Sequence, residues 1–311
     1  MVELFFILSG FFAFKLVKKI MKGYSFREYF SKKYIRLIPA VFVAAFTYEM
    51  LVFMYCHQSD RLYEWSTPSR IDVWGTIISA LGFQEGWGFT NPAINNPTWY
   101  ISVLLLCYVW LYVIAFFAKK LGINPIYGYI LMIMIGTGIT TYSSEIPFFC
   151  GQDARGYYAF FTGVLLGNVC ESHKEVSNRC RRICELIFAL EVLCLIFRIN
   201  YVYADGVRGN TPFFLTFCVY PLLIIICHSL DLHNRFIGII GEITYDIYVW
   251  HNVVLFAEFV ILNHYRVNVD FSSARNVMLY ILAVVIVGTV SHFTIDRFVP
   301  RIFDSKRECG N

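Results

Sequence analysis

The sequence predicts an all-α membrane protein, a polytopic bundle of about nine transmembrane helices with one short interfacial helix. Hydrophobic residues make up 58% of the 311 residues and charged residues only 15%, whereas a soluble domain carries about 25% charged residues. A water-soluble fold of this length could not cover its surface with so few charges. The apolar runs are long and unbroken, which favours helices over the alternating strands of a membrane barrel.

Most of the hydrophobic segments reach the ~20 residues that cross a ~30 Å hydrocarbon core. They cover residues 2–17, 34–56, 98–118, 123–143, 156–171, 183–203, 212–230, 236–263 and 274–298. A further run, Ile71–Phe83, is too short to span and lies between Trp74 and Trp87. Because amphipathic rings favour the membrane surface, we expect this run to lie on the interface or to dip into it.

Positive charge predicts the orientation. The loops after the first, third, fifth and seventh segments and the tail after the ninth hold most of the 26 Lys and Arg residues, including every lysine. By the positive-inside rule these loops and the C-terminus face the cytoplasm, and the expected location is a bacterial inner membrane. Met1 then lies outside, although no signal peptide precedes the first run. We therefore expect one membrane domain, residues 1–311, that lacks an upstream helix; a short tilted first helix or an inverted topology is the alternative.

Several classes of site have no support in the sequence. The 10 cysteines show no C-x-x-C spacing, so we predict neither a disulfide framework nor a metal site. No Walker loop, G-x-S-x-G, H-E-x-x-H or glycine-rich dinucleotide loop occurs. The basic residues lie at predicted membrane ends and not on a soluble module, so we expect no nucleic-acid binding and no resident cofactor.

Polar residues within the apolar runs are site candidates, because they are costly in hydrocarbon unless they are paired or face a wet cavity. Ser9 and Gly10 form a small notch in an aromatic stretch, for which close helix packing is the alternative. Lys33 and Arg36 share one helix face, which suits the binding of phosphates. Contact with membrane lipid headgroups explains this basic pair as well.

Two later stretches also carry polar groups. Trp99 and Ser102 follow Pro97 at a predicted helix start, where a belt tryptophan with a helix cap is the alternative. The spacing of Tyr245, Tyr248 and Asn252 predicts that they share one face of a long helix.

On the same helix, His251 falls near mid-membrane and can change charge near neutral pH. A neutral, hydrogen-bonded structural histidine is the alternative. Weaker candidates are Glu49, Glu191, His292 and Asp296.

Four pieces of the sequence, in this order, resemble the acyltransferase-3 family of multi-helix membrane acyltransferases. They are Phe5–Phe12 (FFILSGFF), Lys33–Pro39 (KYIRLIP), Pro97–Leu105 (PTWYISVLL) and Ile243–His251 (ITYDIYVWH). The resemblance runs through nearly the whole chain. It implies an O-acyltransferase that moves an acyl group, often acetyl, from cytoplasmic acyl-CoA to a hydroxyl of a surface polysaccharide, a lipid-linked sugar or a related acceptor.

The resemblance also implies residue roles. The family's basic pair, usually Arg-x-x-Arg, is thought to hold the CoA phosphates. Here it is Lys33 and Arg36, so the charge is kept and the first bidentate fork is lost; Ser9 and Gly10 would join this donor site. The family's catalytic His lies on a helix before FFxxSG, so the catalytic residue is expected upstream of Met1 and His251 is not assigned that role.

In this interpretation, Trp99, Ser102, Tyr245, Tyr248, His251 and Glu49 are candidates for the cavity or the acceptor site. The outer segment from His57 to Asn96 is a candidate for acceptor contact, although a tryptophan belt explains it equally well; its tryptophans are Trp65, Trp74 and Trp87. One expectation is that this acyltransferase is inactive without the upstream helix; a glycan or lipid transporter and a non-catalytic remnant are the alternative functions.

Overall fold

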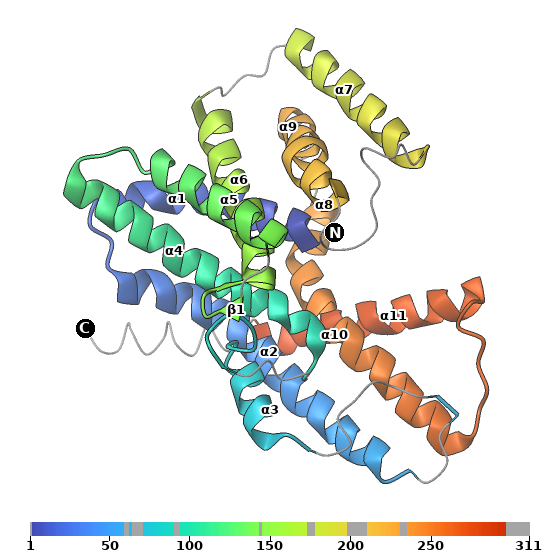
Figure 1. Ribbon diagram of the computed structural model, residues 1–311. Helices are drawn as coiled ribbons and strands as arrows, with labels where there is room; N and C mark the ends of the chain where they lie inside the picture. The colour runs from blue at the N-terminus through green and yellow to red at the C-terminus, as the bar shows by residue number, and fades with distance from the viewer. Residues whose placement is uncertain are drawn as a thin grey trace. The chain divides into compact units, whose positions relative to one another are not determined.

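The computed structural model describes residues 2–58, 62–63, 71–89, 94–142, 145–172, 178–197, 210–230 and 235–296. Over these ranges the regular secondary structure is helical apart from one hairpin, so the predicted all-α class is confirmed (Figure 1). The helices are α1 (Val2–Met21), α2 (Phe26–Cys56), α3 (Val73–Ala80), α4 (Trp99–Leu121), α5 (Ile126–Tyr142), α6 (Gly151–Ser172), α7 (Asn178–Ile196), α8 (Asn210–Phe214), α9 (Tyr220–Ser229), α10 (Arg235–Tyr265) and α11 (Ala274–Ser291). The shorter elements are the 3₁₀ helix η1 (Asn96–Thr98), the π-helical turns η2 (Leu215–Val219) and η3 (His292–Asp296), and the antiparallel strands β1 (Glu145–Ile146) and β2 (Phe149–Cys150).

Every predicted hydrophobic segment contains a described helix, but the predicted count of nine spans is not confirmed. The helical stretches that are long and apolar enough to cross a membrane are Phe26–Cys56, Asn96–Leu121, Thr211–Ser229, Gly238–Tyr265 and Ala274–Ile295, counted over the described residues only. α5 has only 17 residues. α1 and α6 carry charged side chains, among them Glu3 and Arg155, which lower their apolarity.

The chain divides into two compact units. Unit 1 consists of Met1–Phe30 and Val103–His233, and unit 2 consists of Ser31–Ser102 and Asn234–Asn311. Helices α2 and α4 contribute residues to both units. The single membrane domain expected from the sequence stays a prediction.

In unit 1, α1 and α6 approach to backbone contact. A Cβ atom on Gly10 would lie 1.9 Å from the carbonyl oxygen of Phe160, and one on Gly163 would lie 2.0 Å from the carbonyl oxygen of Ile7. Lipid tails are as apolar as leucine, so membrane helices associate by such close packing at small residues. The structure therefore favours the packing interpretation of Gly10, and its contact with a donor stays a prediction.

A buried ion pair also joins α1 to α6. The Nε and Nη2 atoms of Arg155 donate to Oε1 of Glu3 at 2.9 and 2.7 Å, and Nη1 donates to Oε1 of Gln152 at 3.1 Å. Glu3 is only 4% exposed. Removal of either charged partner would leave the other charge buried and uncompensated, so this pair fixes α1 along α6.

In unit 2, α2 packs along α10. The rings of Tyr48 and Tyr55 on α2 lie 5.1 and 5.5 Å from the ring of Phe256 on α10, measured between centroids. Just beyond the end of α2, Nε2 of Gln58 donates to the carbonyl of Val260 on α10 at 2.8 Å. Aromatic packing and a polar side chain thus align α2 with α10.

Helix α11 packs against α10 through a buried carboxylate and a glycine. A Cβ atom on Gly288 would lie 2.9 Å from the backbone nitrogen of Ile247. Asp246, fully buried, accepts a hydrogen bond from Oγ of Ser291 at 2.5 Å and lies 3.3 Å from Nδ1 of His292. The weak site candidate His292 is therefore a helix–helix contact, while the side chain of Asp296 lies outside the described residues.

We expect Gly10→Ala to destabilise the protein, whereas Gly138→Ala, inside α5, should stabilise it by up to about 1 kcal/mol because alanine favours a helix over glycine. A methyl group at residue 10 would meet a backbone oxygen at 1.9 Å, whereas nothing lies within 4 Å of a Cβ at residue 138. Because a backbone atom cannot move away by a rotamer change, the expected loss for Gly10→Ala is about 3 kcal/mol of unfolding free energy. Thermal unfolding in detergent, read by size-exclusion chromatography, measures it. Equal stability of the two variants would contradict the α1–α6 packing.

Candidate functional site

Helix α3 lies along α2 and is held at both ends by side chains of α2. At its start, Oε1 of Glu49 accepts a hydrogen bond from the backbone N–H of Asp72 at 2.6 Å. At its end, the hydroxyl of Tyr34 donates to the carbonyl of Leu81 at 2.9 Å. Glu49 and Tyr34 are separated on α2 by about 22 Å of helix. Glu49, a cavity candidate from the sequence, therefore positions the start of α3.

The segment that follows α3, of which the structure describes residues 81–89, is not helical, and Gly82, Gln84 and Gly86 within it are buried. Its left-handed glycines are Gly82, Gly86 and Gly88, with φ of 77°, 82° and 84°. Oγ of Ser102 donates to the carbonyl of Glu85 at 2.7 Å and accepts from its N–H at 3.0 Å, and the indole N–H of Trp87 donates to the carbonyl of Ser102 at 3.2 Å. Ser102 thus holds this segment to the first turn of α4, and its contact with an acceptor stays a prediction.

Asn95 ties the end of the same segment to α10. It has a left-handed φ of 44°, which Asn adopts more readily than most residues. Its Nδ2 donates to the carbonyl of Val249 at 3.1 Å, and its Oδ1 accepts from Nδ2 of Asn252 at 3.3 Å. Asn95 is fully buried, so these bonds satisfy a polar side chain that water does not reach.

Two tyrosines of α10 connect it to the other predicted motifs of unit 2. The hydroxyl of Tyr245 donates to the carbonyl of Leu37 on α2, and the hydroxyl of Tyr248 donates to the carbonyl of Pro97 in η1 at 2.6 Å. The predicted shared face of Tyr245, Tyr248 and Asn252 therefore bonds to α2, to η1 and to Asn95. Three of the four sequence motifs meet around α10.

His251 has a defined tautomer when its ring is neutral. Its Nδ1 lies 2.5 Å from the carbonyl oxygen of Tyr248. Because a carbonyl only accepts, Nδ1 carries the proton and the lone pair of the neutral ring lies on Nε2. The hydroxyl of Tyr280 on α11 donates to the His251 carbonyl at 3.1 Å. The first bond orients the imidazole, which is partly buried, and the second ties the backbone of His251 to α11.

The basic pair, Lys33 and Arg36, lies next in sequence to two residues that make these contacts. Lys33 is partly buried and precedes Tyr34, which holds the end of α3, while Arg36 is exposed and precedes Leu37, which accepts from Tyr245. Trp99, also partly buried, begins α4 directly after η1. These predicted residues belong to unit 2.

Ser9 and Gly10 belong to unit 1, on α1. Their predicted partnership with Lys33 and Arg36 in a donor site stays a prediction.

Sequence reasoning missed Gln84. This side chain is only 3% exposed, and its Oε1 accepts from Oγ1 of Thr98 at 2.7 Å. A polar residue between closely spaced glycines, beside an apolar run, was the available signal for a buried turn.

The predicted acceptor segment is described in part. Trp74 on α3 is 64% exposed and Trp87 is partly buried, while Trp65 lies outside the described residues. Val73 is 66% exposed beside Trp74. An apolar outward face suits a helix at a lipid surface, so the interfacial position of α3 keeps its physical support as a prediction.

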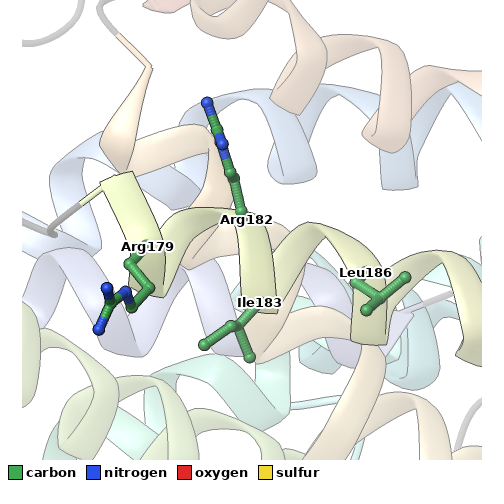
Figure 2. Close-up of a pocket in the computed structure, with 4 residues that line it drawn as sticks. All are labelled: Arg179, Arg182, Ile183 and Leu186. Atoms are coloured by element: carbon green, nitrogen blue, oxygen red, sulfur yellow. The ribbon is translucent and has the colours of Figure 1, made fainter.

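A separate hollow of about 410 Å³ lies at α7 in unit 1, lined by Arg179, Arg182, Ile183 and Leu186. Figure 2 shows that the two arginine side chains point in different directions. Two guanidinium groups that diverge do not grip one phosphate together, so this hollow is a weaker anion site than its composition indicates. In the part of the chain that the structure describes, no three His, Cys, Asp or Glu side chains gather to hold a metal ion.

Comparison with known proteins gives one match. The acyltransferase-3 family model, described as an acyltransferase domain, matches residues 1–295. No curated protein and no solved structure matches the chain.

We expect Asn95→Ala to destabilise the protein and its exposed neighbour variant Asn96→Ala to have little effect. The first change removes both hydrogen bonds to α10, leaves buried groups unpaired and places Ala at a left-handed φ of 44°. The expected loss is about 2–3 kcal/mol for Asn95→Ala and below about 0.5 kcal/mol for Asn96→Ala. Thermal unfolding of the two variants measures the difference. Equal melting temperatures would contradict the anchoring role of Asn95.

Proposed function

The chain belongs to the acyltransferase-3 family, and from this premise we propose that it is a membrane O-acyltransferase. It transfers an acyl group, often acetyl, from cytoplasmic acyl-CoA to a hydroxyl of a surface polysaccharide, a lipid-linked sugar or a related acceptor. Its nine hydrophobic segments span a bacterial inner membrane, with the basic pair and the C-terminus on the cytoplasmic side.

The observation that carries the proposal is the meeting of three motifs around α10. Tyr245 bonds the backbone of α2 beside Arg36, and Tyr248 bonds η1 just before Trp99. Residues 245 and 248 are separated by about 4.5 Å along the helix axis. One face of α10 therefore joins the backbone beside the proposed phosphate-binding pair to the backbone just before Trp99 within unit 2, which supports a single binding region for the donor.

Each part has a role in this proposal. Arg36 offers a planar fork to phosphate, and Lys33 offers a point charge. Tyr245 and Tyr248 hold α2 and η1 against α10. Glu49 and Ser102 hold α3 and the following segment in place.

The transfer itself is a simple exchange of bonds. The acceptor hydroxyl loses its proton to a general base as its oxygen attacks the thioester carbonyl, the new C–O bond forms, the C–S bond breaks, and CoA leaves as a thiol after taking up a proton.

We expect Lys33→Gln and Arg36→Gln each to weaken acetyl-CoA binding about tenfold or more, because each removes a charge-assisted contact to phosphate. Lys32→Gln, an exposed charge change at the adjacent position, is the matched control. Isothermal titration of the purified protein in nanodiscs measures donor affinity. Transfer of labelled acetyl to cell-surface glycan in membranes containing each variant measures the reaction.

A transporter would give a different pattern. Unchanged acetyl-CoA affinity in Lys33→Gln and Arg36→Gln, or glycan flux without labelled acetyl product, would overturn the proposal.

A further inference from the structure

Unit 1 contains an apolar groove of about 300 Å³ between α4 and α5, which the proposed reaction does not use. Gly128 forms part of its lining, and a Cβ there would lie 2.4 Å from Ile114, so the two helices touch at this point. Phe117 and Leu131 line the groove and are 50% and 56% exposed, whereas Met132 is buried. The groove therefore has a packed floor and an open, apolar rim.

The polar groups in the lining are engaged internally. The indole N–H of Trp110 donates to the hydroxyl of Tyr157 at 3.2 Å, and Oδ1 of Asn124 accepts from the N–H of Ile126 at 3.0 Å. A buried water needs two to four polar partners, and an apolar hollow stays dry or takes an apolar ligand. In a bilayer, the apolar material beside such a groove is the acyl chain of a lipid.

The length of the groove fits one leaflet. The lining on α5 runs from Asn124 to Ile135, which is about 16 Å of helix, close to half of the ~30 Å hydrocarbon core. One end is closed by the rings of Trp110 and Phe149, whose centroids lie 5.7 Å apart. The other end, at Asn124, opens towards the loop between α4 and α5.

A cation flanks this open end. Lys120 lies in the last turn of α4 and is exposed, close in sequence to the lining residues Ala118 and Ile123. The amino group of Lys119, by contrast, lies 3.7 Å from the position that a Cβ of Gly23 would take, away from the groove. A lysine near the membrane surface attracts anionic headgroups. The charge at one end and the hydrocarbon slot behind it together match an anionic phospholipid.

We propose that the α4–α5 groove binds one acyl chain of an anionic phospholipid, with its headgroup phosphate at Lys120. The lipid comes from the leaflet that faces this lysine. This site is independent of the proposed acyl transfer, because it concerns lipid retention by unit 1 and not turnover.

The test compares two substitutions on α5. Leu131→Trp fills the groove, whereas Met134→Trp places the same ring at an exposed position, 65% accessible, outside the lining. The full chain is purified, delipidated, and incubated with an equal mixture of phosphatidylglycerol and phosphatidylcholine. Bound lipid is then counted by native mass spectrometry, and size-exclusion chromatography confirms that both variants are folded.

We expect the wild type and Met134→Trp to retain phosphatidylglycerol, and Leu131→Trp to lose most of it. Lys120→Gln should reduce the preference for phosphatidylglycerol over phosphatidylcholine about fivefold, whereas Lys119→Gln, whose amino group lies beside Gly23, should leave this preference unchanged. Equal retention by Leu131→Trp and Met134→Trp, no headgroup preference in the wild type, or displacement of the lipid by a long-chain acyl-CoA would each overturn the proposal.

Discussion

The architecture of unit 2 depends on one constraint: a non-helical segment packed among apolar helices must have its polar groups satisfied by protein. Each of its anchors answers this need, because Ser102 bonds both backbone groups of Glu85 and Asn95 bonds α10 twice. A buried polar group without a hydrogen-bond partner is costly wherever water does not reach it. The hydrogen bonds of Ser102 and Asn95 satisfy the polar groups of the segment. They also fix its position beside Tyr34 and Tyr248, and so give the candidate site its shape.

Unit 1 is held together by close helix packing and a buried ion pair. Its helices α1 and α6 meet where glycine replaces a side chain, at Gly10 and Gly163, so the backbones themselves come into contact. The ion pair between Glu3 and Arg155 adds direction, since two charges buried together tolerate only one helix register. The Ser-Gly step in FFILSGFF thus has a packing reason that needs no ligand.

The helices were predictable from the sequence and most of their partners were not. Long apolar runs locate a helix because hydrocarbon admits little else, and the run at Ile71–Phe83 correctly indicated a short helix, α3. The bond between Asn95 and Val249, however, joins residues 154 positions apart, and no local pattern encodes such a pairing. Ser102 illustrates the same limit. Its polarity marked it as a site candidate, but only the fold shows that its hydroxyl is hydrogen-bonded to the backbone of Glu85.

Two tyrosines of α10 connect the three motifs of unit 2. A carbonyl oxygen has two lone pairs, so the carbonyls of Leu37 and Pro97 can accept the hydroxyls of Tyr245 and Tyr248 in addition to a backbone N–H. Because these tyrosines are three residues apart, they project from one face of α10. A single helix face therefore joins the basic pair to the start of α4, and the three motifs are coupled through backbone carbonyls whose positions depend on one another.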